Sequence, residues 1–313
     1  MARLRISIGA AAVLAAGAVL LDSPTAAAGG PWAAEYFPNV PLTTQDGTVV
    51  HFYDDLLKGN AVVINLIYTR CSASCPLETA KLVQVQRLLG DRVGKDVFFY
   101  SISIDPKHDT PEVLKAYAQR FHVGPGWLFL TGKEEDIQVV GKKLGLSFLT
   151  GAGNRDGHPP ALMIGHEATG EWMRNSTVEN PKFLATMIGD FFGWKTGKPV
   201  RTYAAPARIP RSGKGEYLFS ARCAACHTIG RGDGLGPDLL NVTTLRERGW
   251  LARYVAEPDR MLAEGDRIAA ALFAKYKNVR MPNLGLDSEE VAALLSHIEQ
   301  QSRKHSAAGY GGG

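Results

Sequence analysis

The four cysteines of this 313-residue chain fall into two close pairs, Cys71 with Cys75 and Cys223 with Cys226. Such short spacings suit local chemistry within each pair better than the long-range disulfides of small secreted scaffolds. His227 directly follows the second pair. Each pair is therefore expected to form a chemical site of its own.

The second pair, together with His227, forms the pattern C-x-x-C-H, which is typical of c-type haem attachment. Two thiols one helical turn apart can bond to the two vinyl groups on one porphyrin edge, and the adjacent histidine can bind the iron. A thioredoxin-type site would have a buried strand before the motif, and a zinc site would have a second ligand pair after it. Both features are missing, so the sequence predicts one covalent haem c on Cys223, Cys226 and His227.

Residues 211–301 resemble a class I cytochrome c. The segment Gly236-Pro237-Asp238-Leu239 matches that family's GPDL loop, in which the proline carbonyl is expected to accept a hydrogen bond from His227. The resemblance implies a methionine as the second axial ligand, on the loop before the last helix. Met281 lies on that loop and is the predicted ligand, whereas Met261 is the alternative, in a stretch that looks helical.

The first pair lies between a predicted buried strand and a helix that begins at Pro76. Because a helix N-terminus favours thiolate, the pKa values of Cys71 and Cys75 are expected to be lowered. Two sulfurs on one side of a turn can form a disulfide or act as soft metal ligands, and with one imidazole they suit copper(I). His158, just before another predicted strand, could supply that imidazole.

Residues 41–194 resemble the Sco/SenC family of thioredoxin-fold, copper-binding proteins. The matching segments are Thr69-Arg70-Cys71, Cys75-Pro76, Ser101-Ile102-Ser103-Ile104-Asp105-Pro106, Asp109-Thr110-Pro111 and an opening hairpin at Asp46-Gly47. The resemblance implies a copper ion held by Cys71, Cys75 and His158, and a role in assembling the dinuclear copper centre of cytochrome oxidase.

One stretch departs from the pattern of that family. The family usually has Asp-His followed by Ser or Thr, whereas this chain has Gly157-His158-Pro159-Pro160, so the ligand loop could be reshaped or stiffened. Other thioredoxin-like families fit less well, because a peroxiredoxin would have threonine where Tyr68 stands and a TlpA-like reductase would have C-x-x-C. Asp105 and Asp109 are expected to be turn and helix-entry residues rather than catalysts.

The apolar pattern predicts an α/β thioredoxin-like domain with a mixed sheet, followed by a small all-α cytochrome c domain. Predicted strands cover residues 61–69, 97–104, 127–130, 161–164 and 171–173, and predicted helices cover 76–89, 134–144 and 181–192, with another beginning at 111. His166 is expected in a hairpin turn. The second domain has predicted helices at 215–225 and 250–257, and a third that Asp287 and Glu290 cap.

Residues 1–28 have the form of a signal peptide, with Arg3 and Arg5 before an apolar run that ends in Ala26-Ala27-Ala28. A retained N-terminal anchor is the alternative. The predicted domains are thioredoxin-like at 35–194, a linker at 195–211 and cytochrome c at 212–302, before a disordered tail at 303–313. Export places the chain in the periplasm, an oxidising compartment.

The formal net charge of +4 and the absence of a basic stripe argue against a nucleic-acid partner. The sequence favours a copper chaperone with an electron-transferring haem, whose partner is the copper-bearing subunit of cytochrome oxidase or another periplasmic thiol or copper protein. The alternative is an enzyme, a thiol–disulfide oxidoreductase in which Cys71 and Cys75 are catalytic. The basic linker could contact an anionic membrane surface.

Overall fold

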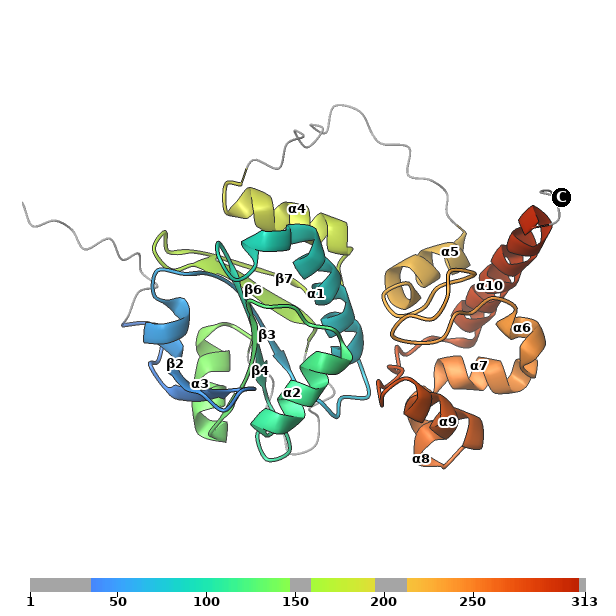
Figure 1. The fold of residues 1–313 in the computed structure, drawn as a ribbon, viewed down its shortest axis with the longest axis horizontal. Coiled ribbons are helices and arrows are strands. Elements are labelled where there is room, and N and C mark those ends of the chain that lie inside the picture. The colour runs from blue at the N-terminus through green and yellow to red at the C-terminus, as the bar shows by residue number, and fades with distance from the viewer. Residues whose placement is uncertain (1–34, 147–158, 195–212, 310–313) are drawn as a thin grey trace, which may run out of the picture.

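The computed structural model describes residues 35–146, 159–194 and 213–309 (Figure 1). The predicted signal peptide at 1–28, the linker at 195–211 and His158 lie outside these residues. Within them, no helix is both long enough and apolar enough to cross a membrane.

The first domain is built on one seven-stranded mixed sheet with the strand order β2-β1-β5-β4-β3-β6-β7. Strands β3, β4 and β5 are parallel, whereas β1 pairs antiparallel with β5 and β6 pairs antiparallel with β3. The strands are β1 Pro41–Thr44, β2 Val49–His51, β3 Ala61–Ile67, β4 Phe98–Ser103, β5 Trp127–Gly132, β6 Ala161–His166 and β7 Glu171–Ser176.

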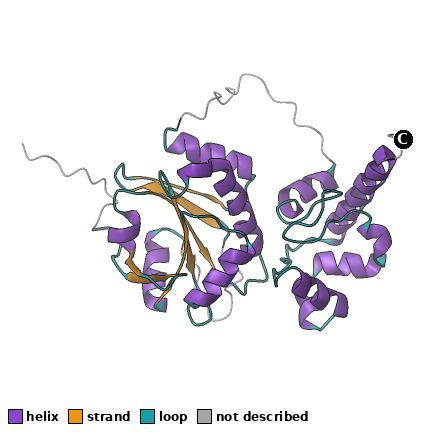
Figure 2. Cartoon of the chain, viewed as in Figure 1, coloured by secondary structure: helices purple, strands orange, loops and turns teal. Residues whose placement is uncertain are grey.

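Helices cover both faces of this sheet (Figure 2). They are α1 Cys75–Leu89, α2 Pro111–Arg120, α3 Glu134–Lys143 and α4 Pro181–Phe191, with a π-helical segment at Phe52–Leu57. All seven residues of β3 are buried, and the six apolar ones lie in two apolar clusters on opposite faces of the strand. Ile64 and Leu66 join the cluster under α3, and Val63 and Ile67 join the one under α1, α2 and α4. This two-sided burial is why every residue of β3 except Asn65 is apolar.

The predicted α/β fold with a mixed sheet is confirmed, and most element boundaries agree within a few residues. The Thr110 hydroxyl accepts a hydrogen bond from the Val113 N–H at 3.4 Å and so caps α2 as predicted. Gly47 adopts φ +81° between β1 and β2, in the expected opening hairpin. The prediction for His166 is wrong, because β6 continues through this residue, which pairs with Glu171.

The second domain, described over residues 213–309, consists of helices joined by loops, with no strand among these residues. Its helices are α5 Lys214–Leu218, which runs into a π-helical segment at Phe219–Cys223, then α6 Val242–Leu245, α7 Arg248–Ala256, α8 Pro258–Ala263, α9 Arg267–Lys275 and α10 Ser288–Gly309. Asp287 and Glu290 form the predicted capping box, each bonding the other's backbone N–H. The disordered tail predicted from residue 303 does not begin there, because α10 continues to Gly309.

Candidate functional site

The C-x-x-C-H residues form a tight turn at the end of the π-helical segment. The N–H groups of Cys226 and His227 both donate to the Cys223 carbonyl, at 3.0 and 2.9 Å. Burial raises the pKa of each cysteine thiol to about 12. A raised thiol pKa disfavours the thiolate that a dithiol redox site uses and is compatible with sulfurs that become thioethers.

His227 is held in one orientation by the GPDL loop. Its Nδ1 lies 2.9 Å from the Pro237 carbonyl oxygen, so the predicted hydrogen bond is confirmed. A carbonyl can only accept, which means that Nδ1 carries the proton and Nε2 keeps its lone pair for a metal. Burial also lowers the pKa of the His227 imidazole, so the neutral, iron-binding form predominates at neutral pH.

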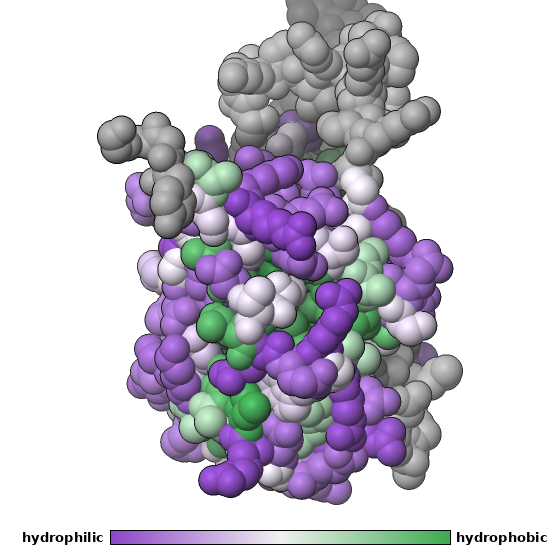
Figure 3. Space-filling view, turned by 90° about the vertical axis from the view of Figure 1, so that its right-hand side faces the viewer, coloured by the Kyte–Doolittle hydropathy of each residue, from purple (hydrophilic) through white to green (hydrophobic). Residues whose placement is uncertain are grey.

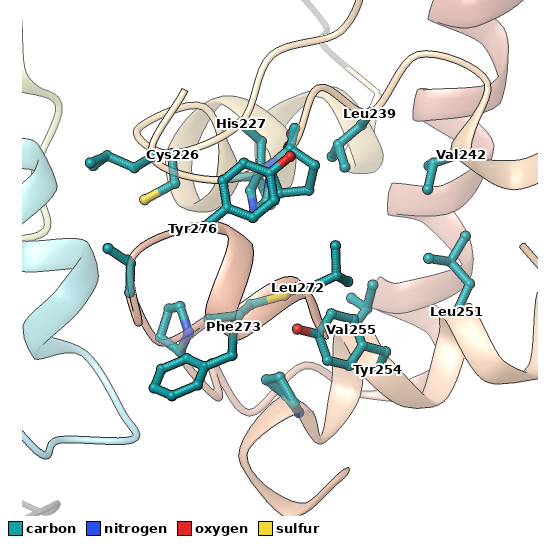
Figure 4. Close-up of a pocket in the computed structure, with 18 of the residues that line it drawn as sticks. Cys226, His227, Leu239, Val242, Leu251, Tyr254, Val255, Leu272, Phe273 and Tyr276 are labelled. Atoms are coloured by element: carbon teal, nitrogen blue, oxygen red, sulfur yellow. Dashed lines mark hydrogen bonds between the residues drawn. The ribbon is translucent and has the colours of Figure 1, made fainter. Parts of the chain in front are cut away.

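A largely apolar cavity of about 390 Å³ opens beside His227. This volume is in the usual range for cofactor and small-molecule sites. Figure 4 shows His227 and Cys226 on one side of it, with side chains from α7 and α9 facing them. Its labelled residues are Cys226, His227, Leu239, Val242, Leu251, Tyr254, Val255, Leu272, Phe273 and Tyr276.

Met281 lines the same cavity as His227. Met261 is buried within α8, only 2% exposed, and is not among the lining residues. An apolar cavity with two thiols, an oriented imidazole and a thioether fits a covalently attached haem. The position of Met281 favours it over Met261 as the second axial ligand.

Asp238 organises the loop between His227 and Pro237, a role that the sequence did not reveal beyond the GPDL match. Its carboxylate accepts hydrogen bonds from three successive backbone N–H groups at residues 230–232, from the Leu240 N–H, and from the Thr228 hydroxyl. Burial opposes ionisation, but these donors outweigh it, so the pKa of Asp238 lies well below its usual value. The ionised side chain thus holds the backbone that orients His227.

The first cysteine pair lies at the carboxyl end of β3, in the thiol loop (residues 68–74 together with Cys75 at the start of α1). Asp109 anchors this loop. It accepts from the Thr69 N–H at 3.1 Å and the Thr69 hydroxyl at 2.5 Å, and from the Ser103 hydroxyl. Arg70 bonds the buried Asp105 at 3.2 Å. Both aspartates thus anchor the loop, in keeping with the turn and helix-entry roles expected from the sequence.

Cys71 and Cys75 are 1% and 0% exposed. The pKa of Cys75 is raised well above its usual value by burial, by a hydrogen bond with Cys71, and by the nearby charges of Cys71 and Glu78. The expectation that the helix N-terminus lowers this pKa is therefore wrong. Desolvation and a neighbouring negative charge outweigh the helix dipole.

Glu78 is a residue of this site that the sequence analysis missed. It is fully buried one helical turn after Cys75, and it accepts from the Ser74 and Thr177 hydroxyls at 2.6 and 2.7 Å. Its spacing of three residues from Cys75 on a helix was the available signal. A buried carboxylate beside two thiols disfavours thiolate in the metal-free protein and favours a bound cation.

The third expected copper ligand, His158, lies outside the described residues. Strand β6 begins at Ala161 and pairs Leu162 with Asn65, near the carboxyl end of β3 where the thiol loop starts. Among the residues that are described, no three His, Cys, Asp or Glu side chains gather into a metal site. Cys71 and Cys75 are brought together, and their soft, adjacent sulfurs fit a copper ion.

We expect Met281→Ala to convert a low-spin haem into a high-spin or exogenously ligated one, because the thioether ligand is lost. Visible absorption and electron paramagnetic resonance would detect the change. Met261→Ala is the control. It should keep the low-spin spectrum while lowering the free energy of unfolding by about 2–5 kcal/mol through a cavity in the core. The reverse pattern of spectra would contradict the ligand assignment.

Asp238→Asn should lower the free energy of unfolding of the cytochrome domain at pH 7 by about 1–3 kcal/mol, because hydrogen bonds to a charged acceptor are lost. The folded pKa of Asp238 is depressed, so this contribution is complete above the unfolded value of 3.8 and is lost as the pH falls below it. Denaturant unfolding followed by haem absorbance would measure both effects. Glu289→Gln, an exposed control with the same charge change, should have little effect; equal losses in both variants would count against the role of Asp238.

Comparison with known proteins finds a matching family model for each of the two domains. A family model for SCO1/SenC matches residues 34–166, and one for cytochrome c matches residues 212–302. The SCO2-like protein of Rickettsia felis is 31% identical over 155 residues, which cover 47% of this chain and 72% of that protein. The mitochondrial protein SCO2 of Saccharomyces cerevisiae is 32% identical over 124 residues, 40% of this chain and 37% of the relative.

Among solved structures, a SCO1/SenC family lipoprotein from Bacillus anthracis has 28% sequence identity and a TM-score of 0.44, covering 49% of this chain and 93% of its own. The sequence matches carry the assignment, because they span most of the Rickettsia relative and a separate family model covers the second domain. This chain belongs to the Sco/SenC family and carries a C-terminal cytochrome c domain, whose cofactor is a covalently attached haem.

Proposed function

We propose that this chain is an exported copper-binding protein that assists assembly of the dinuclear copper centre of cytochrome oxidase and exchanges single electrons through its haem c. The observation that carries the proposal is the pair of buried, hydrogen-bonded thiols at the start of α1, beside the buried carboxylate of Glu78. Membership of the Sco/SenC family supports the copper-handling part.

Cys71, Cys75 and His158 would hold the copper ion. A bound copper ion would supply one-electron chemistry and a cargo for delivery. Two features of the protein would favour a bound cation. Glu78 places negative charge next to the sulfurs, and the anchored loop holds those sulfurs together. Metal coordination removes thiol protons, so the high pKa of Cys75 does not prevent it from acting as a ligand.

Cys223, Cys226, His227 and Met281 would hold the haem, which supplies one-electron transfer when bound. Mainly apolar side chains line the cavity, and the Pro237 carbonyl fixes the tautomer of His227. Hydrogen bonding to the second nitrogen of a ligating imidazole also raises its basicity.

The proposed partner is the copper-bearing subunit of cytochrome oxidase or another periplasmic thiol or copper protein. Export rests on the signal-like residues 1–28, and a periplasmic location follows from it. The basic residues of the 195–211 segment would suit contact with an acidic partner or an anionic membrane surface.

A second candidate is a thiol–disulfide oxidoreductase in which Cys71 and Cys75 cycle and the haem is the electron partner. Their adjacency favours it, since a hydrogen bond joins the two side chains. The raised pKa of Cys75 opposes it, because catalytic thiols of this kind react as thiolates. Rapid reduction of mixed disulfides without stable copper binding would support this enzyme and contradict the copper chaperone.

We expect copper to bind stoichiometrically to the reduced protein and to be lost in the double variant Cys71→Ser with Cys75→Ser. His158→Ala should weaken copper(II) more than copper(I), because two thiolates alone can hold the softer ion. Metal analysis and competition titrations would measure both. The control is His51→Ala, an exposed histidine on β2, which should leave copper binding unchanged. Copper retained by the double variant would exclude this site.

A further inference from the structure

The thiol loop touches the loop of Met281. The Asn283 N–H donates to the Ser72 carbonyl oxygen at 2.8 Å. Ser72 directly follows Cys71, and Asn283 lies two residues after Met281, so the bond joins the copper-ligand loop to the haem-ligand loop. Ser72 also lines the cavity beside His227, together with residues of the second domain.

Further contacts surround this bond. The Arg120 guanidinium, at the end of α2, donates to the Asn278 carbonyl at 3.4 Å. Apolar residues of the cytochrome domain also pack against the cluster under α1 and α2. They are Ala225, Cys226, Leu235 and Val279. We call the two hydrogen-bonded pairs, Ser72 with Asn283 and Arg120 with Asn278, the junction.

Each domain presents a particular side to the other. In Figure 1 the α1 and α2 side of the first domain faces the cytochrome domain, and Figure 4 shows Cys226 on the side of the cavity nearest the first domain. The opposite face of the cytochrome domain presents mainly hydrophilic side chains with smaller apolar areas between them (Figure 3). The haem-attachment turn and the Met281 loop, which flank the cavity, are therefore the parts that meet the first domain.

We infer that the junction docks the thiol loop onto the haem cavity and is the route by which one electron passes between the two sites within a single chain. The inference rests on the proposed function. The step balances with no further reactant, because copper(I) at the thiols becomes copper(II) as ferric haem becomes ferrous. Residues 195–211 already tether the domains, and the junction converts that proximity into one defined arrangement.

Cross-linking tests the docking without copper. In full-length, haem-loaded protein with Cys71→Ser and Cys75→Ser, both native free thiols are gone. Ser72→Cys with Asn283→Cys should then form an intramolecular disulfide on mild oxidation, because backbones joined by a hydrogen bond lie within disulfide reach. The control pair is Ser72→Cys with Ser306→Cys, on the distant end of α10 (Figure 1). Equal or slower oxidation of the Asn283 pair would overturn the docking.

Kinetics test the electron route. In copper(I)-loaded protein with oxidised haem, the haem should be reduced at a rate independent of protein concentration. Arg120→Glu should slow it about tenfold by weakening the tethered contact, and Arg120→Lys, which keeps the charge, should restore most of the rate. Lys142→Glu on α3 carries the same charge change away from the junction and should have no effect. Copper stoichiometry and haem midpoint potential should match wild type in all three.

The outcomes separate two failures. If copper does not bind at Cys71 and Cys75, the proposed function has failed. If copper binds but the haem is not reduced, or Arg120→Glu and Lys142→Glu behave alike, the electron route through the junction is overturned while the copper site stands. Preferential cross-linking together with selective slowing by Arg120→Glu supports the inference.

Discussion

The fixed position of the thiol loop depends on the buried carboxylate of Asp109. It is 0% exposed and accepts hydrogen bonds from both the backbone and the hydroxyl of Thr69, and from Ser103 at the end of β4. A buried carboxylate is tolerated only when such donors satisfy it, so the loop and the strand end must take this arrangement together. The hydrogen bonds of Asp109 therefore help to position the sulfurs of Cys71 and Cys75. They also help to position Ser72, which contacts the cytochrome domain.

The charged groups around the two cysteine pairs differ, and the spacing of the cysteines in the sequence does not show this difference. Burial raises the pKa of Cys75, Cys223 and Cys226 in the free chain. At the haem turn, thioether formation with the haem would replace the S–H groups of Cys223 and Cys226. At the thiol loop, the negative charge of Glu78 further raises the pKa of Cys75, and the same charge would stabilise a cation bound beside it. Desolvation thus disfavours thiolate at both pairs, and the nearby carboxylate of Glu78 distinguishes the first pair from the second.

Sequence patterns predicted the α/β fold because β3 is apolar on both faces and because Pro76 and Pro111 mark helix starts. They missed α6, whose four residues are too few to show a period, and they missed α9, whereas α8 was noted only as a helical-looking stretch around Met261. Spacing and resemblance pointed to His227 and its Pro237 partner, confirmed at 2.9 Å. The pKa of Cys75 was mispredicted, because the helix dipole can be read from sequence whereas burial depends on residues distant along the chain.

The surroundings of the thiols bear on which chemistry they can perform. Exchange with a protein disulfide needs a thiolate that an incoming sulfur can reach in line. Here Cys75 is fully buried, its pKa is raised, Asp109 holds the loop on one side, and Asn283 contacts Ser72 on the other. Opening such a loop for a bulky disulfide would break several of these bonds at once.

A metal ion needs only two adjacent sulfurs and supplies the charge that removes their protons. It can also change oxidation state by one electron, which matches a single haem, whereas a dithiol gives up two. The arrangement of the loop therefore favours metal handling over disulfide exchange.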